Sequence, residues 1–133
     1  MERDTIMDNE YATIYYYTDK GIIHHEWKRY CTGQIFRDIL MEATAQLKAR
    51  KGTKWLSDDR KYTRLTEEDS VWGGKVWFPA TIQTGWRHWA MILPENNMGK
   101  INSSRLIAEY RAGGINAAIF DSVPEAMAWL EIQ

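Results

Sequence analysis

The stretch that decides the fold is IIHHEWKRYCTGQIFRDILMEATAQLKARKGTKWLSD, residues 22–58. Residues 22–27 are rich in β-branched and aromatic side chains, which predicts a strand. Apolar side chains then recur every three or four residues, which predicts an amphipathic helix that Thr32 caps and Gly52 ends. Residues 54–58 predict a second strand. A strand, a helix and a strand in this order predict two parallel strands joined by a right-handed crossover.

The same alternation continues on both sides of this unit. Before it, YATIYYYT (residues 11–18) predicts a strand that pairs with residues 22–27 in an antiparallel hairpin. After it, the sequence predicts a short helix from Thr66, a strand within 85–94, a helix within 103–114, a strand over 115–120 and a last helix that Ser122 begins. The predicted order is ββαβαβαβα, which defines an α/β fold with a mixed sheet. Residues 1–10 predict a flexible lead-in and residues 11–133 a single domain.

The composition excludes several classes of protein. Hydrophobic residues make up 44% of the chain and charged residues 26%, which is typical of a globular domain rather than a disordered one. The net charge of −1 gives no broad positive field for nucleic acid. No apolar run approaches the roughly 20 residues of a membrane span, and the polar start predicts no signal peptide. Because Cys31 is the one cysteine, no intrachain disulfide can form, and we expect a cytoplasmic protein.

The segment TEEDSVWGG (residues 66–74) predicts a short helix with an unusually acidic start. Thr66 stands three residues before Asp69, close to a capping box. The helix is expected to end near residue 76, because Pro79 forbids much extension, with Val71, Trp72 and Val76 on its buried side. Thr66 is also a candidate phosphoacceptor, although three acids in the first turn would repel a phosphate. The cap is the simpler interpretation.

These features together resemble the STAS-domain family, whose members include bacterial anti-sigma-factor antagonists. The matching residues are the hairpin end at Trp27, the KWLSDDR strand end, Val71-Trp72, Trp77, Pro79, Gly85, Ala90, and the closing pattern Phe120, Ala126, Trp129-Leu130. The resemblance implies a mixed sheet with helices and a non-catalytic, protein-binding role in signalling. In the regulatory members the second helix begins with a phosphorylatable serine in an Asp-Ser-Ser-Gly-type motif. Here the corresponding stretch is RLTEED, in which Thr66 is the one hydroxyl.

Polar residues that follow the predicted strands form a candidate binding crevice. Asp58 and Arg60 come at the end of one parallel strand, and Asn96 and Asp121 follow the next two. In open α/β sheets the carboxyl ends of the strands are where ligands usually bind, so we expect these residues to gather with Thr66 at one edge. The alternative is structural: Asp58 bonds loop amides and pairs with Arg60.

The titratable residues do not predict a metal site or a catalytic group. His24 and His25 are adjacent on a predicted strand, so they point to opposite faces and cannot share one ion. His88 is distant in sequence, and no further ligand has metal-binding spacing. Cys31 has no histidine partner, and the basic residues beside it would lower its pKa only slightly. A buried, unreactive thiol is the simpler interpretation, and we expect no cofactor.

The aromatic residues Trp72, Trp77, Phe78 and Trp86 form a second candidate binding surface. They lie in a poorly periodic link that suggests exposure, and exposed aromatic residues often anchor protein interfaces. They could equally stack a flat ligand, or cap the core under a long loop. We therefore predict a STAS-like interaction module that binds a protein partner or forms a homodimer. The alternative is a carrier of a small apolar ligand, or an enzyme, that uses the strand-end crevice.

Overall fold

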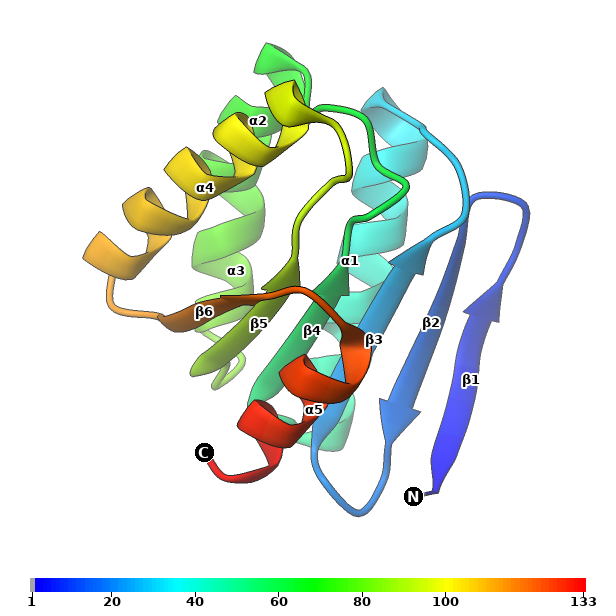
Figure 1. The fold of residues 1–133 in the computed structure, drawn as a ribbon. Coiled ribbons are helices and arrows are strands. Elements are labelled where there is room, and N and C mark those ends of the chain that lie inside the picture. Colours follow the sequence, from blue (N-terminus) through cyan, green and yellow to red (C-terminus); the bar gives the residue numbers. More distant parts are fainter. Residues whose placement is uncertain (1) are drawn as a thin grey trace.

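The protein, seen in a computed structural model that describes residues 2–133, is built on one six-stranded sheet (Figure 1). The strands follow one another across the sheet in chain order: β1 (Arg3–Asp8), β2 (Ala12–Tyr17), β3 (Ile22–Trp27), β4 (Lys54–Asp58), β5 (His88–Ile92) and β6 (Asn116–Phe120). The first three strands pair antiparallel, and β3 to β6 pair parallel. The predicted α/β fold with a mixed sheet is therefore confirmed.

Helices cover both faces of the sheet (Figure 1). Helix α1 (Gly33–Arg50) joins β3 to β4, and α4 (Asn97–Ala112) joins β5 to β6. Between β4 and β5 the chain forms α2 (Glu67–Trp72), the π-helical turn η1 (Gly73–Trp77) and α3 (Phe78–Ile82). Right-handed crossovers that always advance in one direction place their helices on the same face. Helix α5 (Val123–Glu131) follows β6 and packs on the opposite face.

Each face of the sheet carries its own apolar core. The larger core lies under α1 to α4 and is rich in aromatic rings, including Trp27, Trp55, Trp77, Trp86 and Trp89. The smaller core lies under α5 and joins Leu56 and Ile92 of the sheet to Leu130 of the helix. The central strand β5 is buried on both faces, as its continuous apolar run predicts.

The N-terminal segment differs from its prediction. The flexible lead-in expected over residues 1–10 instead contains β1, which pairs antiparallel with β2 and has a register shift between Thr5 and Met7. Most of its side chains are exposed, because β1 is the edge of the sheet and only Ile6 and Met7 pack against the core. Charged side chains on an edge strand discourage pairing with other chains. They also interrupt the alternating apolar pattern from which a strand is predicted, so the sequence does not predict β1.

The helical link between β4 and β5 also differs from its prediction. The helix continues through Pro79, which stands in the first turn of α3, where a proline is tolerated. The π turn lies just before it, and there Phe78 donates its backbone N–H to the carbonyl of Gly73, five residues earlier. Val71 and Val76, expected on the buried side, are 48% and 47% exposed. The buried residues are instead Asp69, Gly73, Trp77 and Thr81, spaced four apart.

Candidate functional site

The strand-end crevice exists in part, and the Asp58–Arg60 pair dominates it. Asp58 ends β4 and is 2% exposed. The Arg60 guanidinium donates to both carboxylate oxygens, at 2.9 and 2.7 Å, and the Arg60 backbone N–H donates to Asp58 Oδ1 at 3.3 Å. Burial alone would raise the pKa of Asp58, but the hydrogen bonds from Arg60 outweigh it and lower that pKa. The structural interpretation of Asp58 is thus confirmed, because the pair holds the loop after β4.

Two shallow depressions meet at Arg60 along this edge. One, of about 450 Å³, reaches Asp121, and the other, of about 280 Å³, includes Asp58. Glu95 lines both of them. Of the five residues expected to gather at this edge, Asp58, Arg60 and Asp121 line these depressions, whereas Asn96 and Thr66 do not. The guanidinium of Arg60 uses two of its N–H groups on Asp58, whose carboxylate balances its charge.

Thr66 and Asn96 do not line this crevice but cap helices. Thr66 Oγ1 accepts the backbone N–H of Asp69 at 3.1 Å, as the capping interpretation predicts. Asn96 Oδ1 accepts the N–H of Gly99 at 2.7 Å, and its amide donates to the carbonyl of Thr63 at 2.8 Å. Their hydrogen bonds position α2 and α4 rather than a ligand at the strand ends.

The predicted aromatic interface is wrong for its central residues. Trp77 is 4% exposed and Trp86 is fully buried, so neither can anchor a partner from the surface. Phe78 is half-buried and stacks on Tyr110 with a ring separation of 4.3 Å. Trp72 is also half-buried, 5.6 Å from the Arg37 guanidinium. The link is helical and packs its aromatic rings inward, so the alternative that they complete the core holds.

Asp69 is a structural residue that sequence reasoning treated only as part of an acidic helix start. Its carboxylate is 1% exposed and accepts the backbone N–H of Gly33, at the start of α1, at 2.9 Å. It also accepts from Arg37 Nε at 3.1 Å. Thr32, the expected cap of α1, makes no side-chain capping bond, so Asp69 of α2 provides that cap from a distance of 36 residues in sequence.

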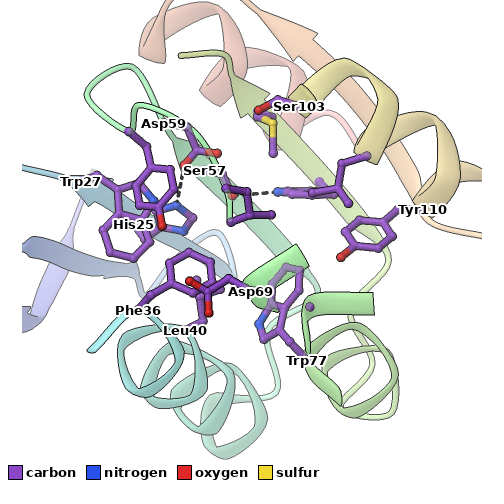
Figure 2. A pocket seen from close by; sticks show the side chains of 16 residues that line it. His25, Trp27, Phe36, Leu40, Ser57, Asp59, Asp69, Trp77, Ser103 and Tyr110 are labelled. Atoms are coloured by element: carbon purple, nitrogen blue, oxygen red, sulfur yellow. Dashed lines mark hydrogen bonds and ion pairs between the residues drawn. The ribbon is translucent and has the colours of Figure 1, made fainter. Parts of the chain in front are cut away.

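A cavity of about 60 Å³ lies between the sheet and helices α1, α2 and α4 (Figure 2). Its polar groups include His25 of β3, Ser57 at the end of β4 and Asp59 just beyond β4. Aromatic rings stand on both sides of it, with Trp27 and Phe36 on one side and Trp77 and Tyr110 on the other (Figure 2). Tyr62 packs against the first pair and Trp89 against the second. Sequence reasoning missed this site, because its residues are spread over 86 positions of the chain, from His25 to Tyr110.

Both ring nitrogens of His25 are already bonded. The indole N–H of Trp55 donates to Nδ1 at 2.9 Å, and Nε2 lies 3.0 Å from Asp59 Oδ1. Because an indole nitrogen can only donate, Nδ1 carries no proton, so Nε2 carries it and donates to Asp59. Ser57 Oγ accepts from the indole of Trp89 at 2.8 Å and makes no bond to His25. The His25–Ser57–Asp59 cluster therefore does not form a nucleophile–base pair.

His24 lies on the opposite face of the sheet, as the alternation of side chains along a strand predicts. Its Nδ1 is 3.1 Å from the hydroxyl of Tyr17, and its Nε2 has no hydrogen-bond partner within residues 2–133. Burial lowers the pKa of His24 from 6.5 to about 4, so the ring is neutral near pH 7. Burial raises the pKa of Cys31 to about 11, against the slight lowering expected from its basic neighbours. Among the described residues no three side chains gather as ligands for a metal ion.

A surface groove of about 450 Å³ runs between α2 and α4, and we call its lining the α2–α4 face. Val71 and Met98 are about half exposed there, at 48% and 54%. Leu65 and Leu106 line both this groove and the internal cavity. The complete lining is Arg64, Leu65, Thr66, Glu67, Ser70, Val71, Met98, Asn102, Arg105, Leu106 and Glu109.

Comparison of the chain with family models, with curated proteins and with solved structures finds no match. Within residues 2–133, none of the helices has both the length and the apolar character that crossing a membrane requires.

Proposed function

We propose that this protein is a non-catalytic, STAS-like interaction module that binds a second copy of itself through the α2–α4 face. The observation that carries the proposal is the apolar centre of that face. Val71 and Met98 project into the groove with about half of their surface exposed, and Leu65 and Leu106 continue the apolar lining. Adjacent apolar side chains at a grooved surface are typical of protein interfaces.

The charges around this apolar centre favour a second copy as the occupant. Arg64 and Arg105 line the same groove as Glu67 and Glu109, so both signs are present on one face. Within residues 2–133 none of the four forms an ion pair. A two-fold interface joins the same surface of both subunits and must therefore be self-complementary. Arginines of one copy can then pair with glutamates of the other.

The arrangement of the internal histidine supports a role without catalysis. A general base needs a nitrogen that can accept a proton, and His25 Nδ1 is occupied by the Trp55 indole. The rival function, a carrier of an apolar ligand, has less support. The internal cavity of about 60 Å³ is smaller than the 150 Å³ or so that accommodates a benzene ring. Signalling as the biological role and the cytoplasm as the location are parts of the same proposal.

Sedimentation velocity over a range of protein concentrations tests self-association. We expect the unmodified protein to form dimers and Met98→Glu to weaken dimerisation by about tenfold or more, because a carboxylate would be buried without a partner. Ile132→Glu is the matched control, since Ile132 is 80% exposed and lies outside the groove. A monomer at all concentrations, or equal dimerisation of the two variants, would contradict the proposal.

A further inference from the structure

We infer that the internal cavity beside His25 binds the head group of a small primary ammonium ion, with Asp59 as its counter-ion. The inference rests on the charge, the aromatic walls and the acceptors of the cavity. It goes beyond self-association and does not depend on it.

Within residues 2–133, one carboxylate at the cavity has no lysine or arginine side chain to balance its charge. Asp69 also lines the cavity, but the Arg37 guanidinium neutralises it at 3.1 Å. Asp59 is bonded to His25, whose ring is neutral because Nδ1 accepts from Trp55. Among residues 2–133 no lysine or arginine lines the cavity. Since the side chain of Asp59 is only 15% exposed, water screens its charge poorly and a small cation would be attracted to it.

The walls of the cavity also favour a cation. Six aromatic rings line it, and cations are attracted to the negative faces of such rings. Two of the three indole N–H groups at the cavity, which could attract an anion, are already used inside the protein. Trp77 donates to Thr44 Oγ1 at 3.2 Å, and Trp89 donates to Ser57 at 2.8 Å. The Tyr62 hydroxyl likewise donates to the carbonyl of Cys31 at 2.6 Å, so with these three donors engaged the rings present largely electron-rich surface to the cavity.

The free acceptors match the three donors of a primary ammonium group. Asp59 Oδ2 and the hydroxyl of Ser103 make no hydrogen bond to another group within residues 2–133, and Ser57 Oγ retains a lone pair beside the bond from Trp89. Asp59, Ser57 and Ser103 all line the cavity (Figure 2). A fully methylated ammonium has no donors to offer these oxygens.

The size of the cavity sets the size of the ligand. A volume of about 60 Å³ exceeds the 10–15 Å³ or so that one water needs but stays below that of a cavity that takes benzene. A methylammonium-sized head group fits between these limits. Leu65 and Leu106 line both the cavity and the α2–α4 groove, so the two spaces are neighbours.

Titration with methylammonium, followed by the indole N–H signals in ¹H–¹⁵N NMR spectra, tests the inference. We expect saturable shifts of the Trp77 and Trp89 signals and none for Trp129, which packs in the other core. Methanol and acetate, the neutral and anionic probes, should leave all signals unchanged, and tetramethylammonium should bind more weakly than methylammonium. No saturable shift with methylammonium, equal binding of methanol, or tighter binding of tetramethylammonium would overturn the inference.

The variant Asp59→Asn isolates the charge, because its carbonyl oxygen can still accept the proton of His25 Nε2. We expect this variant to weaken methylammonium binding by about tenfold or more, and the control Asp19→Asn, in the exposed β2–β3 turn, to leave it unchanged. Ser103→Ala on the half-buried side of α4 should weaken binding several-fold without unfolding the chain. Binding that is unchanged in both cavity variants would overturn the inference.

Discussion

Replacing Asp69 with alanine should lower the free energy of unfolding by about 2–4 kcal/mol, because this carboxylate links α2 to the start of α1. Its loss leaves the N–H of Gly33 without the acceptor that lies 2.9 Å away, and a hydrogen bond to a charged group contributes about 1.5–3 kcal/mol. The bond to Arg37 adds less, since the arginine side chain is 31% exposed and water can replace the carboxylate. The bond from the Asp69 backbone to Thr66 is retained, so α2 keeps its own cap.

Urea denaturation followed by tryptophan fluorescence measures this effect. For a slope of about 2 kcal/mol/M, the midpoint should fall by about 1–2 M urea. The matched control is Glu68→Ala, which removes the same charge from an exposed position next to Asp69 and should change stability by less than about 0.5 kcal/mol. If Asp69→Ala were no more destabilising than Glu68→Ala, Asp69 would not cap α1 in solution, and the account of how α1 and α2 are joined would be wrong.

Two further predictions test other parts of the structure. The free energy of unfolding should fall by as much as about 3 kcal/mol between pH 6.5 and about 4, because the unfolded chain protonates His24 in this range while the buried ring, with its pKa lowered to about 4, stays neutral. Denaturation curves of His24→Gln should lack that part of the pH dependence. An identical pH dependence of stability in both proteins would refute the prediction. Trp77→Ala should lower the free energy of unfolding by about 3–5 kcal/mol and Val76→Ala by less than about 1 kcal/mol, because Trp77 is 4% exposed and Val76 47%. Equal decreases in the melting temperatures of the two variants would show that Trp77 is not part of the core.

The sequence and the structure agree best where a segment is strongly periodic. The hairpin of β2 and β3, the long helix α1, the buried strand β5 and the caps at Thr66 and Ser122 follow from local patterns, because each depends on neighbours within a few residues. The prediction fails for β1, because this strand is held mainly by backbone pairing with β2 and buries few apolar side chains. It also fails for the helix through Pro79, since a π turn changes the periodicity on which the prediction relies.

The candidate sites divide in the same way. The gathering of Asp58, Arg60 and Asp121 at one edge could be predicted, because parallel strands end on the same side of their sheet. The burial of Trp77 and Trp86 could not be predicted, because the local sequence around an aromatic residue in a non-periodic link is the same whether the ring packs in the core or is exposed to solvent. The cavity around Asp59 could not be predicted either, since β3, β4, α1, α2 and α4 form it only after they have packed together.

The sequence by itself determined the alternation of strands and helices, the antiparallel or parallel direction of the strands from β2 onward, and the opposite orientation of His24 and His25. These features depend on backbone geometry over a few residues and on the length of each connection. Tertiary structure alone decided that Asp69 caps a distant helix, that both nitrogens of His25 are engaged and that Asp59 lines a cavity to which no lysine or arginine of residues 2–133 contributes. The physical reason is that burial and hydrogen-bond partners are properties of the surroundings of a side chain, and those surroundings come from segments far apart in the chain.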